Sequence, residues 1–513
     1  NRKRVLVITL IIFVSSLALY PLIGKELFPA VDSGQLVIRV RAQTGTRLEK
    51  TEELVKQIEA VIKKQIPEND LKMMISNIGV LLDWPAAYTP NSGPQDAFIN
   101  LQFSEKRKKT AQEYADNLRK ELNSKFTGVE FAFDTGGLIT SALNFGLPSP
   151  IDIQVEGNDL GVSYKIAEKI KKIVDSVPGT TDVRIQQKLD YPQIEINVDR
   201  VKAAYLNLTQ EDVVKNIVTT INSSINFNPA FWIDHRNGNH YFLGAQYREE
   251  EINSLDTLKN IPITGSNNGD HNGGPVLLRN VASFERTTAP SEINHLNISR
   301  VIDVFSNVSG RDIGSVVTDI EKKLRDLDVP SGYFVHMRGE VQSMRESFGS
   351  MGFGLILAIV LVYLVMVVQF RSFRDPLIVM FAIPLGLIGV LIMLFLTGTN
   401  LNIQSIMGII MMVGIVVAFS ILLVDFINRL IDEGLDLKDA VLKAAGIRLR
   451  PILMTALAAV LGLTPMALFG GVNIPLARAV IGGVIASTVL TLVVVPILYI
   501  MFKGKKMEAS DNI

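Results

Sequence analysis

Six long apolar segments, separated by polar sequence, dominate the hydrophobic pattern of the chain. Each is 18 to 25 residues long. A helix of about 20 apolar residues crosses the hydrocarbon core of a bilayer, which is about 30 Å thick. We therefore expect one transmembrane helix, a long polar segment and then five more transmembrane helices. The predicted helices cover residues 5–23, 351–368, 377–397, 403–427, 451–469 and 479–502.

Basic residues beside these segments predict the orientation of the chain in its membrane. Cytoplasmic loops of membrane proteins carry an excess of lysine and arginine. Such residues flank the first and last apolar segments and occur in the connections 369–376 and 428–450. The connections 398–402 and 470–478 contain none and one. Both ends are therefore expected in the cytoplasm, and residues 24–350 on the other side of the membrane.

Within residues 24–350, short strands are predicted to alternate with amphipathic helices. Strict alternation of apolar and polar residues is typical of a strand that buries one face, and apolar spacings of three and four are typical of a helix. The first part gives the order β-α-β-β-α-β, a ferredoxin-like unit. Its apolar strand positions are Leu36, Ile38, Val40, Ile99, Leu101, Phe103, Val129, Phe131 and Phe133, and its helical stripes are Leu54, Ile58, Val61, Ile62 and Ala111, Tyr114, Leu118, Leu122.

A second, similar unit is predicted to be interrupted by an insertion. It begins with a strand at 151–155, and its closing half appears only near residue 300. The intervening residues, 201–296, contain a helix of their own at 209–220 and a turn rich in glycine and asparagine at 265–274. We therefore expect two similar subdomains and one inserted module.

Composition and charge narrow the classes of function. The chain has 513 residues, 51 basic and 51 acidic side chains and no cysteine. No segment forms a dense basic stripe, so nucleic acid is not expected as a partner. The lack of cysteine excludes disulfide and thiol chemistry. We find no nucleophile–base pair and no metal-ligand cluster, and expect neither an enzyme nor a bound cofactor.

A series of motifs, in order and at suitable spacing, resembles the second half of a resistance–nodulation–division (RND) efflux transporter of the hydrophobe/amphiphile branch. The resemblance covers essentially the whole chain. The motifs are FPAVDSG at 28–34, GT at 45–46, VPG at 177–179 followed by DVR at 182–184, VDR at 198–200, QFRS at 369–372, ILLVDF at 421–426 and RLRPILMT at 448–455.

The resemblance implies an α+β membrane protein with two ferredoxin-like porter subdomains and an inserted docking domain in its periplasmic region. The docking domain would face an outer-membrane channel. The implied divisions are the first transmembrane helix at 1–24, the first porter subdomain at 25–135, the second at 136–199 and 297–340, the docking domain at 200–296, the five-helix bundle at 341–506 and a cytoplasmic tail at 507–513.

The resemblance also implies a function and partners. The expected function is proton-driven export of small amphiphilic or hydrophobic compounds, with multidrug resistance as its consequence. The expected cellular location is the bacterial inner membrane. The implied partners are a periplasmic adaptor (membrane fusion) protein, an outer-membrane channel and the other half of the transporter, in a homotrimer.

Four residues are candidates for a proton relay. Asp425 is the only acidic residue inside the predicted helices, where a charge costs about 2.5–3.5 kcal/mol. Its alternative role is an acid that reaches water at the cytoplasmic end of its helix. By the resemblance, Arg448 and Thr455 match relay positions, and Ser420 is a further candidate. Arg448 equally fits the positive-inside rule, and the Thr455 hydroxyl equally fits a bond to its own helix.

One departure from the family pattern bears on the relay. Drug-efflux members have a lysine where Ala418 stands, beside Phe419. Alanine neither carries charge nor responds to a proton. Coupling would then run through Thr455 and Ser420, or be weak in this half.

By the same resemblance, the substrate cleft lies between the porter subdomains. Trp84 and Tyr88 lie on the loop 79–94, which matches a mobile loop that divides the pocket, and Phe131 and Phe133 match a stretch near its entrance. Aromatic side chains suit apolar, adaptable ligands. The alternative is that Phe131 and Phe133 fill the core of the sheet.

Two other functions compete with drug export. In metal export, Met73 and Met74 could not both bind one ion, because adjacent strand residues point to opposite faces. His235 and His240 lie in a polar loop and lack a supporting set of carboxylates or cysteines. The second alternative is a weakly coupled or non-transporting scaffold subunit.

Overall fold

The computed structural model describes residues 2–29, 32–80, 91–136, 148–265 and 275–510. The chain forms two compact units. One comprises Asn1–Lys188 with Glu292–Ile513, and the other Leu189–Ser291.

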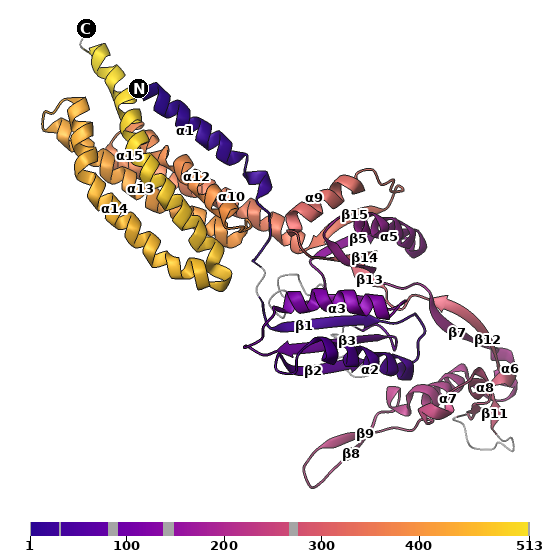
Figure 1. Cartoon of the computed structure of the whole chain (residues 1–513). Coiled ribbons are helices and arrows are strands. Elements are labelled where there is room, and N and C mark those ends of the chain that lie inside the picture. Colours follow the sequence, from indigo (N-terminus) through magenta and orange to yellow (C-terminus); the bar gives the residue numbers. More distant parts are fainter. Residues whose placement is uncertain (1, 30–31, 81–90, 137–147, 266–274, 511–513) are drawn as a thin grey trace. The chain divides into compact units, whose positions relative to one another are not determined.

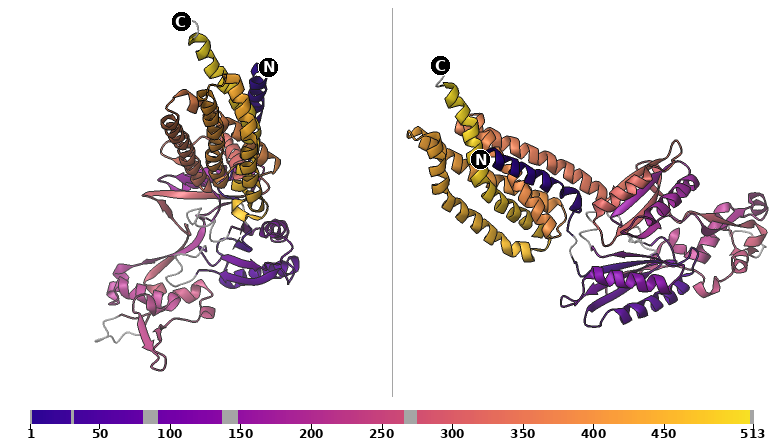
Figure 2. Two further views of the ribbon diagram at one scale, coloured as in Figure 1. Left: turned by 90° about the vertical axis from the view of Figure 1, so that its left-hand side faces the viewer. Right: turned by 45° about the horizontal axis from the view of Figure 1, so that its top comes forward.

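Six helices among the described residues are long and apolar enough to cross a membrane, which confirms the predicted set of one and then five. They form one bundle in both views of Figure 2. The candidate spans are Lys3–Leu22, Glu340–Phe370, Arg374–Leu396, Ile403–Asp432, Leu437–Phe469 and Gly471–Lys503. These spans are longer than the predicted segments and also include Glu340, Glu346, Asp375, Asp432 and Asp439. The expectation that Asp425 is the only acidic residue in a span is therefore wrong.

The spans are built from α1 and α10 to α15 (Figure 1). Two glycines bring α12 and α15 together: a Cβ added at Gly389 would lie 2.0 Å from the Gly482 carbonyl oxygen. Small residues at such a crossing let two backbones approach closely inside a membrane. The helices are α1 (Arg2–Leu17), α10 (Glu340–Phe370), α11 (Arg374–Met380), α12 (Ala382–Leu396), α13 (Ile403–Asp432), α14 (Leu437–Phe469) and α15 (Ile474–Ser510).

The first ferredoxin-like unit has the predicted order of elements. Its antiparallel sheet has the strand order β2-β3-β1-β4. The alternating residues Leu36, Ile38 and Val40 are buried against the stripes of the two helices, as the periodicity predicts. The elements are β1 (Gln35–Arg41), α2 (Leu48–Gln65), β2 (Leu71–Ile78), β3 (Asp96–Phe103), α3 (Ala111–Lys125) and β4 (Glu130–Asp134).

The second unit repeats this arrangement from two distant parts of the chain. Its sheet has the order β13-β14-β5-β15, and β6 pairs with β14 farther along the edge that β13 also contacts. Ile151, Ile153 and Val155 pack against α5 and α9, which lie together beside the sheet (Figure 1). The elements are β5 (Ile151–Glu156), α5 (Leu160–Asp175), β6 (Thr180–Ile185), β13 (Asn294–Leu296), β14 (Ser299–Val308), α9 (Ile313–Leu324) and β15 (Phe334–Gly339).

The unit Leu189–Ser291 overlaps the predicted insertion and has its own small core around Val213, Leu258 and Leu278. The predicted helix at 209–220 is α7 (Gln210–Asn222), which begins with a capping box. The remaining elements are β7 (Tyr191–Val198), α6 (Arg200–Tyr205), β8 (Ala230–Ile233), β9 (His240–Leu243), α8 (Leu255–Lys259), β10 (Pro262–Ile263), β11 (Val276–Leu277) and β12 (Ala282–Ala289).

A short segment after α1 contacts both the bundle and the second ferredoxin-like unit. The Lys25 backbone N–H donates to Asp312 Oδ2 at the start of α9 (2.8 Å), and the Glu26 N–H donates to the Leu401 carbonyl between α12 and α13 (3.1 Å). The Glu26 carboxylate accepts from the Asn400 side chain (2.9 Å). Burial raises the pKa of Glu26. This segment therefore provides a direct mechanical link between the bundle and the sheet domains.

Candidate functional site

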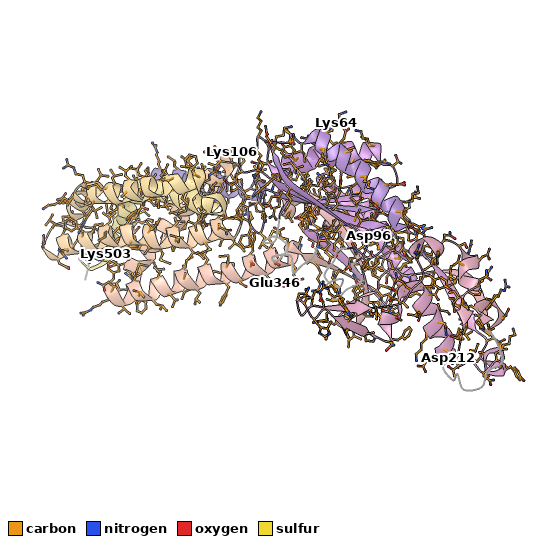
Figure 3. All side chains as sticks on the ribbon, turned by 90° about the horizontal axis from the view of Figure 1, so that it is seen from below. Lys64, Asp96, Lys106, Asp212, Glu346 and Lys503 are labelled. Carbon is orange, nitrogen blue, oxygen red and sulfur yellow. The ribbon has the colours of Figure 1, made fainter. Side chains whose placement is uncertain are left out.

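A small cavity lies where β1, β3 and β4 of the first ferredoxin-like unit meet β6 of the second. Its lining is mostly charged and polar. Asp96, at the start of β3, is labelled in Figure 3. The lining includes Arg39, Arg41, Asn91, Asp96, Glu130, Phe131, Arg184 and Gln186.

Ion pairs tie the two sides of this cavity together. Arg41 Nε donates to Asp96 Oδ1 (2.7 Å), and its Nη1 donates across to the Gln186 carbonyl (2.6 Å). Lys188 Nζ donates to Glu130 Oε1 (2.8 Å). Charge-assisted bonds of this kind are stronger than neutral ones, so they hold the cavity walls in place.

Arg184 makes the inner wall positively charged. Only 7% of this residue is exposed, and its guanidinium donates at 3.2 Å to Ser149 Oγ and at 3.3 Å to the Asp182 carbonyl. Burial and the nearby charges of Arg39 and Arg41 lower the pKa of Arg184 to about 9. The lining therefore combines three arginines and two carboxylates with the apolar residues Val40, Ala97, Phe131 and Ala132.

Asp182 joins the two ferredoxin-like units beside this cavity. Its buried carboxylate accepts from Arg119 Nε (2.7 Å), the Phe133 backbone N–H (3.0 Å) and Asn307 Nδ2 (2.9 Å). Burial disfavours the Arg119 charge, but the bonds to Asp182 outweigh this and hold the pKa of Arg119 above its ordinary value. Asp182 also has φ of +55°, a left-handed conformation that Asp tolerates better than most residues.

The second sheet buries polar side chains on the face away from its apolar core. Asp152 and Gln154 on β5 and Asp303 on β14 are buried there. Burial and the neighbouring charge of Asp303 raise the pKa of Asp152 to about 8. The neighbouring carboxylate therefore disfavours the ionised state of Asp152.

The predicted substrate contacts are only partly placed by the structure. Phe131 and Phe133 are 6% and 4% exposed and belong to the apolar core of the first unit, although Phe131 also borders the cavity. Trp84 and Tyr88 lie outside the described residues. All four stay predictions as substrate contacts.

The residues weighed for metal binding do not converge. Met73 is 46% exposed, whereas Met74 packs against the apolar core, as their adjacency predicts. His240 lies on β9, with its ring against Phe231. Across the described ranges, no three His, Asp or Glu side chains are grouped as metal ligands.

The predicted relay residues lie on two neighbouring helices, Ser420 and Asp425 on α13 and Arg448 and Thr455 on α14. Arg448 lies over the ring of Phe426, 4.5 Å from its centroid. Phe426 follows Asp425 in sequence, and Asp425 is exposed on α13. Ser420 is buried and donates to the Val416 carbonyl (3.1 Å). Thr455 donates to carbonyls of its own helix at 3.0 Å. A relay through these four residues stays a prediction.

Ala418 shares an exposed stripe of α13 with Asp425. Met407, Met411 and Leu422 lie on the same stripe. A lysine at position 418 would therefore point away from the core of this bundle.

A polar network at one end of the bundle was missed by the sequence reasoning. Lys503, labelled in Figure 3, donates to Tyr499 Oη (2.5 Å) and Asn428 Oδ1 (2.7 Å), and lies 3.7 Å from Asp375 Oδ2. Asn428 Nδ2 donates to the same carboxylate oxygen (3.4 Å). Asp375 was overlooked because it precedes the third apolar segment. In the sequence, Asp375 is marked only as an acidic residue beside Arg371 and Arg374, the two arginines that predict a cytoplasmic connection.

Comparison with known proteins identifies the family. The AcrB/AcrD/AcrF family profile matches residues 1–503. The chain belongs to the AcrB/AcrD/AcrF family. This result confirms the predicted RND resemblance.

Relatives of this AcrB/AcrD/AcrF-family chain include metal-resistance proteins. It is 29% identical over its whole length to the cobalt-zinc-cadmium resistance protein CzcA of Cupriavidus metallidurans, and covers 48% of that protein. It is 31% identical, over 69% of its length, to the nickel and cobalt resistance protein CnrA of the same organism, covering 33% of it. The chain thus spans about half the length of CzcA.

A solved structure supports the same relationship. The crystal structure of a heavy metal efflux pump matches 98% of this chain with a TM-score of 0.84 and 26% sequence identity, and the match covers 51% of the pump. A second crystal form of a heavy metal efflux pump gives a TM-score of 0.83.

Proposed function

We propose that the chain forms one half of a secondary transporter that exports metal cations, driven by the proton gradient. The observation that carries this proposal is the similarity, over the whole chain, to CzcA, whose name states resistance to cobalt, zinc and cadmium. The match to a heavy metal efflux pump supports it. On the sequence alone, export of hydrophobic compounds ranked above metal export. The comparisons favour the opposite order, and metal export becomes the leading hypothesis.

The described geometry gives little support to an amphiphilic cargo. The aromatic side chains Phe131 and Phe133 pack in a core, and the cavity between the ferredoxin-like units is lined by charges. An amphiphilic ligand needs a mainly apolar pocket with a few polar groups. The five charged side chains of the described lining, Arg39, Arg41, Asp96, Glu130 and Arg184, depart from that pattern.

The proposed assembly is the one expected for a member of this family. The ferredoxin-like units act as porter subdomains and Leu189–Ser291 as the docking domain, on the periplasmic side of an inner membrane. The other half of the transporter, a periplasmic adaptor and an outer-membrane channel are the expected partners, in a trimer. The relay candidates Asp425, Arg448, Thr455 and Ser420 belong to the proton path in this proposal.

The resistance spectrum of the full-length transporter tests this function. Expressed with its adaptor and channel in a metal-sensitive host, it should raise the tolerated concentration of at least one of zinc, cobalt, nickel, cadmium or copper several-fold. Tolerance of amphiphilic dyes and detergents should not change. The matched control is the same strain with Asp425→Asn and Thr455→Ala combined, at equal membrane abundance.

Two results would contradict the proposal. Protection against amphiphiles alone would restore the drug-export hypothesis. Protection against neither class, with normal abundance and trimer formation, would favour the scaffold hypothesis.

A further inference from the structure

The polar face of the second ferredoxin-like sheet contains three buried oxygen atoms without a donor. They are Asp152 Oδ1, Gln154 Oε1 and Asp303 Oδ1, and none of them accepts a hydrogen bond from any described residue. The three residues are 0%, 7% and 4% exposed. Buried acceptors are almost always paired, so three in one place require an explanation.

The strand register places these residues together. Asp303 on β14 lies directly opposite Gln154 on β5, and Asp152 lies two residues along β5, opposite Phe305. Side chains directly opposite on one face of an antiparallel pair have Cβ atoms about 5 Å apart, and diagonal neighbours are about 7–8 Å apart. All three oxygens are therefore within reach of a single ion.

Amide groups fix the other oxygen of each carboxylate. Gln154 Nε2 donates to Asp152 Oδ2 (2.9 Å). Gln187 Nε2 donates to Asp303 Oδ2 (2.6 Å), and Asn294 Nδ2 donates to the same atom (3.3 Å). Such outer bonds orient metal-binding carboxylates and leave their second oxygen free for the ion.

The nearby arginines do not satisfy these oxygens. Arg338 on β15 lies opposite Asp152 and its charge acts on that carboxyl, but its guanidinium donates its hydrogen bond to Gln342 at 3.4 Å. Arg184 lies opposite Phe305 and stacks on its ring, 5.2 Å from the centroid.

We propose that Asp152, Asp303 and Gln154 bind a resident divalent cation that prefers oxygen ligands, such as Ca²⁺, Mg²⁺ or Mn²⁺. Two carboxylates and one amide oxygen are ligands of the hard class, and water completes the coordination. The absence of His and Cys from the set disfavours softer metals. Because the ligands are buried, this ion is separate from the transported cargo and holds β5 and β14 together, so the proposal does not depend on the exported substrate.

Titration of the purified full-length transporter with Mn²⁺, followed by the electron paramagnetic resonance signal of the free ion, tests the site. Asp152→Asn and Asp303→Asn should each bind one Mn²⁺ fewer per polypeptide than the native protein. Added Mn²⁺ should raise the midpoint of thermal unfolding of the native protein by about 5 °C at a hundredfold excess over its Kd, and leave both variants unchanged.

The control is Asp70→Asn. Asp70 is also buried, but its carboxylate accepts from Tyr114 Oη (2.5 Å) and the Lys108 N–H (3.3 Å), so this variant should retain the native Mn²⁺ count. Asp152→Asn replaces the carboxyl group with a neutral amide of the same shape and should fold at least as well as the native protein without metal. Loss of its ion is therefore not explained by misfolding. Equal Mn²⁺ counts in the native protein and both variants would overturn the proposal and mean that the two carboxylates share a proton.

Discussion

Replacing Gly482 with valine is expected to abolish transport by separating α12 from α15. Even a single Cβ at this position would lie 2.4 Å from the Met393 Cβ and 2.5 Å from the Gly389 carbonyl oxygen. A clash with backbone atoms cannot be relieved by rotating a side chain. The loss of folding free energy should therefore exceed the value usual for an overpacked core, about 1–3 kcal/mol. Fluorescence-detected size-exclusion chromatography should show loss of the folded transporter.

The same substitution at Gly462 is the matched control. Gly462 is also within a membrane helix, α14, but an added Cβ there has no described neighbour within 4 Å. Gly462→Val should therefore leave the folded yield of the protein close to that of the native chain. Equal yields of Gly462→Val and Gly482→Val would contradict the close crossing of α12 and α15.

Asp182→Asn is expected to lower the unfolding free energy of the porter region by about 3–5 kcal/mol. Asparagine tolerates the left-handed backbone conformation at this position, so backbone strain does not change. The loss of stability comes from removing the negative charge of Asp182, which leaves the buried Arg119 guanidinium without that ion-pair partner. Thermal unfolding and limited proteolysis of the purified transporter measure the effect.

Asp116→Asn removes a second partner of the same arginine and serves as the control. Asp116 is half exposed, and exposed ion pairs contribute about 1 kcal/mol or less. A similar loss in Asp116→Asn and Asp182→Asn would show that the buried pair does not join the two ferredoxin-like units.

The parts of the fold that could be predicted from sequence are those encoded by local periodicity. Runs of 18 or more apolar residues give membrane helices whatever their neighbours are. The alternation around Ile38 and the stripe around Ile58 give a strand and a helix that share a core. The ends of the helices were less predictable because polar residues such as Asp375 continue the third span.

The candidate site depends on contacts between residues far apart in the chain. Asp182 meets Arg119 and Asn307 only after the second ferredoxin-like unit has closed around its insertion. The alternating sequence of β5 indicates one buried face and one exposed face. The structure buries both, which is why Asp152 and Gln154 gave no signal as a site.

The metal content of intact cells tests the central claim most directly. Cells with the full-length transporter, its adaptor and its channel would be loaded with the metal against which it protects, and their metal would be measured by mass spectrometry with and without an uncoupler of the proton gradient. The account predicts several-fold less metal in the energised cells than in cells lacking the transporter, and equal amounts after uncoupling. Equal metal in energised cells with and without the transporter, together with exclusion of an amphiphilic dye, would contradict it.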